Sequence, residues 1–515
     1  MKRRFFRKMF SILAASALLL QAAGCASGSS GSASEGSAAS RAGESGGEFV
    51  FGLQTQPDHL DPYLAATADT RQILFNLFEG LVKPDSDGNL QPALAQTWSM
   101  SNDAVTYTFR LRTGVKFHNG ETVTPEDVKY SLEKAAGLND GNILVSSLSN
   151  IKSVETDGTD GVIITLKEPD FDFLPNLTVA VVPEDYTDQD THPVGTGPYK
   201  FESFTPQQSV VLVKNDDYWQ EGIPYLDKVT FKLESDSNAL LMDLEGGSVD
   251  GAAVANNVAS QLGDGFDVIQ TNSNSVQLLA LNNAAEPFDS KLVRQAVSYA
   301  VDPDEIIDTV ELGKGVRVGT PVIPGLKKYS DESLTHAYDQ DAEKARQLLA
   351  QAGYADGFSF TITVPSNYTV HVDAAQVIAN ELKAVGITAE IKQIDFATWV
   401  SKVYTDRDYE ATIISVDGAT LSPKSYLSRY VSTDSKNFVN YKNDQYDTLY
   451  ADAANEPDEA KRVELYKQAQ EFLSADAASV YIQDISSLIA LKDGVTGYTA
   501  YPLYVFDAST IRYGS

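Results

Sequence analysis

Two successive helix–glycine–strand units constrain the fold of this chain more than any other feature of its sequence. In each unit a helix-forming stretch ends at a glycine and leads directly into a run of β-branched and apolar residues. This joint is typical of α/β domains, because glycine adopts the left-handed conformation that ends a helix. The units run through residues 341–352, Gly353 and 358–364, and then through 373–385, Gly386 and 387–394.

Other segments carry strand and helix patterns that fit the same fold class. Apolar and polar residues alternate over 105–112, which predicts a half-buried strand. Thr124 and Pro125 then have the residue types of an N-cap and a first helical position, so a helix is expected from there to residue 136. The remaining expected elements are helices at 289–301 and 457–474 and strands at 229–233 and 480–483.

The charge of the chain excludes several classes of function. The formal net charge is −31, and the first 24 residues carry five positive charges and no acid, so the rest carries −36. Such an acidic body repels phosphate backbones, and we expect no nucleic-acid partner. It also argues against a folded surface lying on anionic lipid.

Few residues of this chain have the chemistry of a metal, cofactor or catalytic site. One cysteine excludes a disulfide framework, a Cys-rich zinc site and an iron–sulfur cluster. The five histidines form no H-E-x-x-H motif, and no phosphate-binding glycine loop or G-x-S-x-G elbow is present after residue 48. We therefore expect no metal, no cofactor and no enzymatic activity.

The N-terminus predicts where the protein resides. Residues 1–24 have the basic start, the short apolar run and the small-residue end of a secretory signal peptide. Cys25 follows directly, as in the lipobox of bacterial lipoproteins, although Ala22 stands where that motif usually has leucine. In residues 26–48, 19 of 23 positions are Gly, Ser or Ala, which indicates a flexible tether. We expect lipidation at Cys25 and attachment to the outer face of the cell membrane, or a periplasmic location if an outer membrane is present; an ordinary signal peptide with an incidental cysteine is the alternative.

A set of motifs resembles a known family of binding proteins. The segments that carry the resemblance are 95–99 (AQTWS), 114–120 (GVKFHNG), 123–128 (VTPEDV), 195–199 (GTGPY) and 293–302 (VRQAVSYAVD). Their residues and their order resemble family 5 of the bacterial extracellular solute-binding proteins, the peptide- and nickel-type receptors of ABC importers. The resemblance covers residues 49 to 490.

The resemblance implies an α/β fold of the periplasmic-binding-protein type: a clamshell of two lobes joined by hinge strands, with an extra inserted domain. The 515-residue length is also that of two or three domains. We expect lobe I in three pieces, domain II as the insertion, and lobe III opposite them. The expected boundaries are 1–24 for the signal peptide, 25–48 for the lipidated cysteine and tether, 49–89, 193–283 and 489–515 for lobe I, 90–192 for domain II and 284–488 for lobe III.

The same resemblance indicates one loop for the ligand site. In peptide-binding members this loop carries an aspartate that pairs with the ligand's α-amine. Aligning residues 423–427 (PKSYL) with the family pattern puts Ala419 at the position of that aspartate and Val416 at that of a common tryptophan. Asp417 lies two residues earlier and is our candidate anchor, with a turn-forming Asp-Gly pair as the alternative. Peptide-amine recognition is therefore not carried over from the family.

Five further residues are candidates for ligand binding, one in the loop of Asp417 and four elsewhere in the chain. Phe396 has the position of a frequently aromatic pocket residue, and Trp399 lies one helical turn later; core packing is the alternative for both. Glu79 belongs to a segment that approaches the cleft in relatives. Arg407 is a candidate partner for a ligand carboxylate, with a solvated loop arginine as the alternative. Thr420 is a further candidate in the loop of Asp417.

These expectations describe a monomeric, non-catalytic receptor that binds a peptide or a peptide-sized polar solute in a cleft between the lobes. Its partners would be that solute, the permease subunits of an ABC importer, and the membrane through its lipid. The alternatives are a receptor for a metal chelate or another small metabolite, a signalling receptor, and a lipoprotein hydrolase with an unrecognised carboxylate pair.

Overall fold

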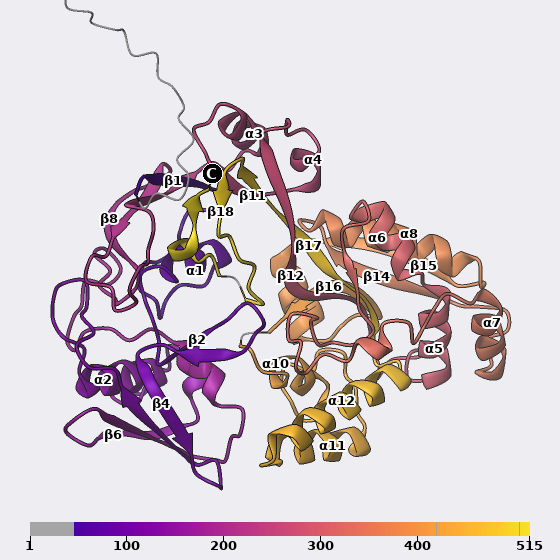
Figure 1. The fold of residues 1–515 in the computed structure, drawn as a ribbon. Helices are drawn as coiled ribbons and strands as arrows, with labels where there is room; N and C mark the ends of the chain where they lie inside the picture. The colour runs from indigo at the N-terminus through magenta and orange to yellow at the C-terminus, as the bar shows by residue number, and fades with distance from the viewer. Residues whose placement is uncertain (1–45, 419, 504, 515) are drawn as a thin grey trace, which may run out of the picture. The chain divides into compact units, whose positions relative to one another are not determined.

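A long mixed sheet organises the fold (Figure 1). The computed structural model describes residues 46–418, 420–503 and 505–514, and in this part of the chain the sheet has eleven strands. Its edge-to-edge order is β15 (Thr388–Ile394), β14 (Ser359–Pro365), β16 (Ala411–Asp417), β12 (Phe266–Leu281), β17 (Val480–Lys492), β11 (Gly251–Val254), β1 (Glu48–Leu53), β10 (Lys228–Leu233), β9 (Ser209–Lys214) and β8 (Tyr199–Thr205), with β13 (Val316–Arg317) paired to β17.

Smaller sheets accompany the long one within the described ranges. A four-stranded antiparallel sheet has the order β4 (Ala95–Met100), β5 (Thr106–Leu111), β7 (Gly161–Leu166) and β6 (Ile151–Thr156). Two-stranded sheets join β2 (Val82–Pro84) to β3 (Leu90–Pro92) and β18 (Val495–Thr496) to β19 (Arg512–Tyr513).

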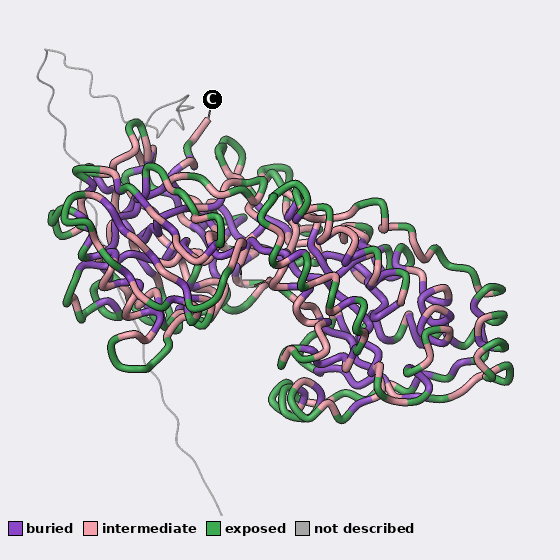
Figure 2. Tube along the Cα trace, turned by 90° about the horizontal axis from the view of Figure 1, so that it is seen from below, coloured by how far each residue is buried: buried purple, intermediate pink, exposed green. Residues whose placement is uncertain are grey.

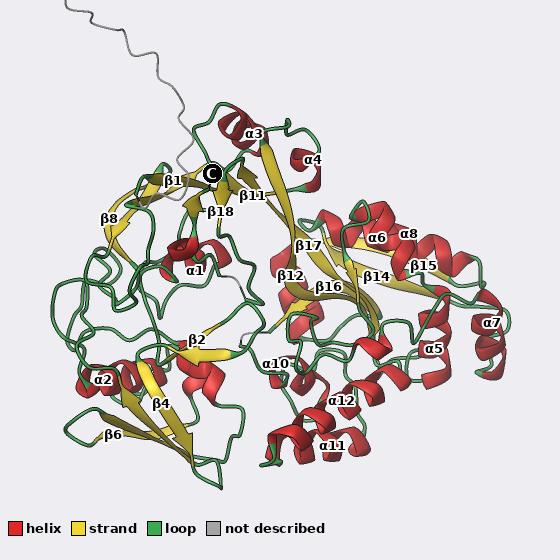
Figure 3. Ribbon diagram, in the orientation of Figure 1, coloured by secondary structure: helices red, strands yellow, loops and turns green. Residues whose placement is uncertain are grey.

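Helices precede, separate and follow these strands (Figure 3). The α-helices are α1 (Ala68–Leu74), α2 (Pro125–Ala136), α3 (Ser237–Glu245), α4 (Asn256–Ala259), α5 (Lys291–Ala300), α6 (Pro303–Val310), α7 (Ala342–Gln351), α8 (Thr369–Lys383), α9 (Phe396–Trp399), α10 (Lys424–Leu427), α11 (Asp444–Asn455) and α12 (Glu459–Ala475). The short 3₁₀ turns are η1 (Ser146–Leu148), η2 (Leu174–Thr178), η3 (Glu332–Leu334), η5 (Ser428–Tyr430) and η6 (Ala508–Thr510), and η4 (Val400–Thr405) is a π-helix.

Helices cover both faces of the sheet around β12, β14 and β16. On one face, Leu279 and Leu281 of β12 pack in a core with residues of α5, α7 and α8. On the other, Leu278 and Ala280 pack with residues of η4, α11 and α12. A sheet buried on both faces needs near-continuous apolar strands, and the last eight residues of β12 are all buried. Figure 2 shows how buried and exposed residues are distributed along the trace. A further core joins β1, β9 and β10 to the four-stranded sheet.

The structure confirms the predicted fold class and several predicted elements. Helix α2 follows Thr124, whose hydroxyl accepts from the backbone N–H of Asp127, while the Asp127 carboxylate accepts from the N–H of Thr124. Strand β5 and helix α5 lie within the expected 105–112 and 289–301. The two helix–glycine–strand units are α7 with β14 and α8 with β15, and β14 and β15 pair in parallel. The domain boundaries remain predictions.

Two elements differ from their predicted bounds. Helix α8 begins at Thr369 rather than 373, although its first residues are β-branched or His, because the burial of His371 and Val372 outweighs their low helix propensity. Strand β17 continues to Lys492 rather than ending at 483. The polar residues after 483 break the apolar pattern, but β12 and β11 pair with this stretch and keep it extended.

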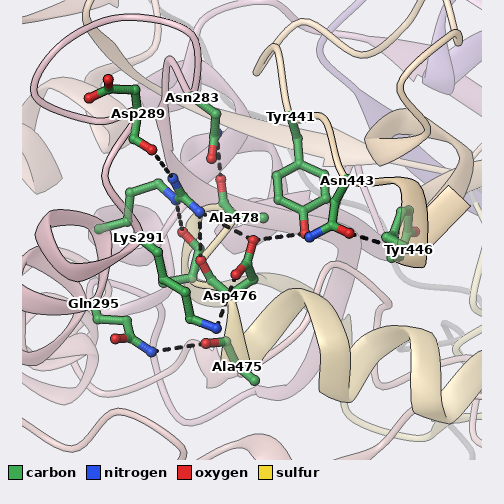
Figure 4. A network of polar contacts seen from close by, with 12 residues as sticks. Asn283, Asp289, Lys291, Gln295, Tyr441, Asn443, Tyr446, Ala475, Asp476 and Ala478 are labelled. Carbon is green, nitrogen blue, oxygen red and sulfur yellow. Dashed lines mark hydrogen bonds and ion pairs between the residues drawn. The ribbon is translucent and has the colours of Figure 1, made fainter.

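A carboxylate at the end of α12 joins that helix to α5 and to the segment before α11 (Figure 4). Asp476 accepts from Lys291 at 3.1 Å, from the Arg294 guanidinium at 3.2 Å and from the Tyr441 hydroxyl at 2.9 Å. Arg294 is buried and also donates to the carbonyl oxygens of Phe288 and Ala477. This network satisfies a buried cation.

The predicted signal peptide, Cys25 and most of the predicted tether lie outside the described residues. Among the described helices, none is long and apolar enough to cross a bilayer.

Candidate functional site

Three parallel strands end at one edge of the long sheet and bring candidate residues together there. Strand β14 pairs in parallel with β15 on one side and with β16 on the other, so Pro365, Ile394 and Asp417 end their strands at the same side. Ligands of open α/β sheets bind beyond the carboxyl ends of such strands. We call the residues at and after the ends of these three strands, 366–368, 395–399, 417–418 and 420–423, the carboxyl edge.

Exposed aromatic rings lie at the carboxyl edge. Phe396 is 40% exposed and Tyr368 is 38% exposed, and their rings meet edge to face at 5.4 Å between centroids. Trp399 stacks on Phe396 at 5.8 Å but is only 5% exposed, and its indole N–H donates to Thr412 Oγ1 at 2.9 Å. Phe396 and Tyr368 therefore present a surface, while Trp399 supports it from the core.

Tyr368 was not among the predicted site residues. It lies three residues beyond the end of β14, at the position directly before α8. Its position after the first of two parallel strands is the signal that identifies it, because this is where α/β sheets place ligand contacts.

Asp417 is the last residue of β16 and is exposed. Among the described residues, no side chain pairs with its carboxylate, whereas its carbonyl oxygen accepts from the Arg429 guanidinium at 3.3 Å. The next residue, Gly418, lies so close to the Tyr426 ring that an added Cβ would come within 2.5 Å of it. Only glycine therefore fits at position 418 in this arrangement. Ala419, at the position of the family's aspartate, lies outside the described residues.

Arg429 supplies a positive charge next to Asp417 that the predicted set lacks. Its Nε donates to the Ser425 carbonyl oxygen at 3.1 Å, and among the described residues no carboxylate pairs with it. It lines a small, mostly apolar cavity of about 10 Å³ with Tyr430 and Phe438. Asp417 at the edge and Arg429 in the following turn η5 thus bring one anionic and one cationic residue together.

The remaining predicted residues of the second half of the chain have local partners. The Thr420 hydroxyl lies 3.0 Å from Ser425 Oγ and belongs to the same loop as Asp417. Arg407 precedes β16 and so lies at the opposite end of this strand from Asp417. Its guanidinium donates to Asn440 Oδ1 at 3.3 Å and to the Ser435 carbonyl oxygen at 3.2 Å. The structure does not bring Arg407 to the carboxyl edge.

Glu79 lies in a different network. It is 7% exposed and accepts from the Tyr218 hydroxyl at 2.8 Å, the Trp219 indole N–H at 2.9 Å and the Thr196 hydroxyl at 3.2 Å. Burial raises the pKa of Glu79, while the charge of Lys83 and these hydrogen bonds oppose the rise. All three hydrogen-bonding partners belong to residues 196–219, so the carboxylate ties this segment to one that is more than one hundred residues away in the sequence.

A row of buried neutral polar groups leads across the sheet toward the carboxyl edge. The Gln483 amide donates to Gln277 Oε1 at 2.7 Å, and the Gln277 amide lies 2.9 Å from His371 Nδ1. Burial lowers the pKa of His371 to about 4, so this imidazole is neutral at physiological pH and accepts at Nδ1. Ser415 Oγ is buried in the same row and has no partner among the described residues. These groups form hydrogen bonds but carry no charge.

Among the described residues, no group of three or more His, Cys, Asp or Glu side chains is arranged to hold a metal ion.

The sequence is similar to those of known binding proteins. The profile of the bacterial extracellular solute-binding proteins, family 5 middle, matches residues 89–438. Heme-binding protein A of Haemophilus influenzae is 28% identical over 96% of this chain and 97% of its own length. The glutathione-binding protein GsiB of Pectobacterium atrosepticum is 29% identical over 87% of this chain and 90% of its own length.

The fold is also similar to solved structures. The ABC transporter-associated periplasmic binding protein DppA of Helicobacter pylori, solved in complex with the peptide STSA, is 26% identical and has a TM-score of 0.73. The match covers 92% of this chain and 99% of that chain.

Proposed function

Because the chain belongs to family 5 of the bacterial extracellular solute-binding proteins, we propose that it captures a zwitterionic, peptide-sized solute at the carboxyl edge and delivers it to an ABC permease. Proteins of this family are non-enzymatic transport receptors that act outside the cytoplasm, and this chain is one of them. The hydrolase alternative is therefore set aside.

The observation that carries the proposal is the carboxylate of Asp417, which has no side-chain partner in the part of the chain that the structure describes and lies beside Arg429. A ligand ammonium would supply the missing partner of Asp417, and a ligand carboxylate would supply that of Arg429. The exposed rings of Phe396 and Tyr368 offer an apolar surface for the part of the ligand between its charges.

The names of the relatives indicate several classes of ligand. The charges of Asp417 and Arg429 favour ligands that carry both an amine and a carboxylate. Glutathione and the peptide STSA both carry a free amine and a free carboxylate, as the proposed site requires. Heme, named for another relative, carries carboxylates but no amine. A heme or a metal chelate is therefore the alternative that the binding experiment has to separate.

We also propose that lipid on Cys25 holds the mature protein at the membrane through the tether of residues 26–48. Such a leash places a receptor near its permease while leaving it free to meet solute.

The proposal is tested by titrating the purified protein with short peptides, glutathione, heme and nickel–histidine while recording melting temperature and heat of binding. A ligand that binds only the folded state raises stability by about 2.7 kcal/mol at 100-fold saturation. Native mass spectrometry of the protein as purified tests for a ligand carried over from the cell. We expect amine-bearing peptides or glutathione to shift the melt; a shift by heme or the nickel chelate alone contradicts the zwitterion proposal.

A further inference from the structure

In one stretch of the long sheet, β12 and β17 pair with each other and have almost no other strand neighbours. Strand β16 pairs with β12 only from Ser275 onward, and β11 pairs with β17 only from Leu488 onward. Between these limits β12 and β17 pair with each other, and on the other side of β17 the two-residue strand β13 reaches only Gln483 and Asp484. We call residues 271–275 of β12 and 484–487 of β17 the waist. Figure 1 shows β12 and β17 running side by side through it.

The pairing within the waist is irregular. The register between β12 and β17 shifts between Asn272 and Val276, and Asn274 has a φ of 57°, in the left-handed region. A bulge of this kind interrupts the ladder and lets the strand bend. With few neighbours and a broken ladder, the waist is the stretch of the long sheet most able to act as a hinge.

A carboxylic acid is buried at one end of the waist. Asp484 is 0% exposed, and its Oδ1 accepts from the backbone N–H of Ser275 at 3.3 Å and from the Ser273 hydroxyl at 3.1 Å. Its Oδ2 is buried and has no partner among the described residues. Each of these contacts comes from the irregular stretch of β12.

No charged group on the elements next to Asp484, among the described residues, supplies a positive charge that could pair with its carboxylate. On β13, Arg317 lies opposite Gln483 and is occupied by Asp304 at 2.6 Å and Asp339 at 2.8 Å. Glu311, which follows α6, accepts from the Ser486 hydroxyl at 3.1 Å and adds a further acid. On the β16 side, Asp417 lies opposite Ser275 and is also an acid.

A buried carboxylate without a cationic partner is costly, because burial removes its hydration and nothing replaces it. The carboxylic acid form avoids this cost. Accordingly, burial raises the pKa of Asp484 to about 7, while its hydrogen bonds to residues 273–275 oppose the rise.

We propose that Asp484 makes the waist a proton-controlled hinge: the protonated side chain packs β12 against β17, and loss of its proton admits water and loosens this pair. The direction of the pH dependence follows from the difference between the pKa of Asp484 in the folded and in the unfolded chain. The folded-state pKa lies above that of the unfolded chain, so the stabilisation is complete at acidic pH and is lost as pH rises toward about 7. This inference concerns the waist itself and holds whichever solute the protein binds.

Hydrogen exchange of the full chain without added ligand tests the proposal at pH 5.5 and pH 8, after correction for the intrinsic exchange rate. For residues 271–276 and 484–488 we expect protection about tenfold lower at pH 8 in the native protein. Asp484→Asn, which removes the charge and keeps the shape, is expected to give equal protection at both pH values. Equal pH dependence in the native protein and in Asp484→Asn overturns the proposal.

Two matched variants and one direct measurement separate Asp484 from its neighbours. Asp267→Asn, an exposed residue of β12, and Glu311→Gln are expected to keep the native pH dependence. Loss of the dependence in Glu311→Gln assigns the effect to that residue and overturns the proposal. If Asp484→Asn does not fold, the carboxyl ¹³C shift of Asp484 in the native protein decides: a titration midpoint near pH 7 supports the hinge, and one near 4 overturns it.

Discussion

The indole N–H of Trp219 donates a hydrogen bond of 2.9 Å to Glu79 Oε2, and this carboxylate is almost completely buried. Two hydroxyls, of Tyr218 and Thr196, donate to the same carboxylate. The buried Glu79 carboxylate thus accepts three hydrogen bonds. These bonds hold together two segments that are more than one hundred residues apart in the sequence.

Glu79→Gln is expected to destabilise the protein. The amide replaces one acceptor oxygen by a donor, which then faces hydrogen-bond donors in a site with little water. The expected loss is about 1–3 kcal/mol in the free energy of unfolding, measured by urea denaturation. The exposed Glu221→Gln serves as control; equal losses in the two variants contradict this role of Glu79.

Asp417 and Arg429 are expected to bind opposite ends of the ligand, the ammonium and the carboxylate. Asp417→Asn should weaken binding of a free peptide by about 2 kcal/mol or more if the ligand covers this carboxylate, because the ligand ammonium loses the anionic partner proposed for it. Calorimetry with the same peptide acetylated at its amine provides the control, since that ligand should bind native protein and variant alike. Arg429→Gln should show the converse, a loss for the free carboxylate but not for the C-terminal amide. If neither variant distinguishes these ligands, the anchors lie elsewhere.

Asp476→Asn is expected to destabilise the core around α5 and α12. The variant removes the counter-charge of the buried Arg294, and a buried ion pair broken on one side costs about 3–5 kcal/mol. Backbone carbonyls still accept from Arg294, so we expect the lower end of that range. Asp406→Asn breaks an exposed pair with Lys402 and should change the denaturation midpoint little. Similar midpoints in both variants argue against the network in Figure 4 as a stabilising element.

His118 is expected to make stability depend on pH on the acid side. Its Nδ1 accepts from the Gly195 N–H at 3.3 Å and its Nε2 lies 3.1 Å from the Gly197 carbonyl oxygen, so the neutral ring satisfies both neighbours. Burial lowers the pKa of His118 to about 4, below the 6.5 of the unfolded chain. The unfolded state therefore binds the proton first, and stability falls as pH drops from 6.5 toward 4. The stability difference between native protein and His118→Gln should shrink over this range; a constant difference contradicts the assignment.

Cys25→Ser is expected to release the protein from membranes, because the lipid is the proposed anchor. Fractionation of cells that express native protein or variant, followed by immunoblotting, measures the distribution. Unchanged membrane association in the variant contradicts lipid anchoring at this residue.

The fold class was predictable because it depends on local patterns that repeat along the chain. The glycines that end α7 and α8, the capping residues of α2 and the alternation in β5 each act over a few residues, so the sequence shows them directly. The extent of β17 was not predictable, because the polar stretch in its middle breaks the apolar pattern and the strand is held extended by pairing with β12 and β11, which are distant in sequence.

For the site, the sequence determined which loop to examine, and the tertiary structure decided which residues meet there. Asp417 and Phe396 were predicted from the resemblance to the family, and the structure brings them to one side of the sheet because their strands run parallel. Tyr368 and Arg429 join them only through the folding of the segments around α8 and η5, and Glu79 and Arg407 lie in other networks. The buried state of Asp484 was likewise invisible in the sequence, because burial and the absence of a cationic partner are properties of strands that come together from opposite parts of the chain.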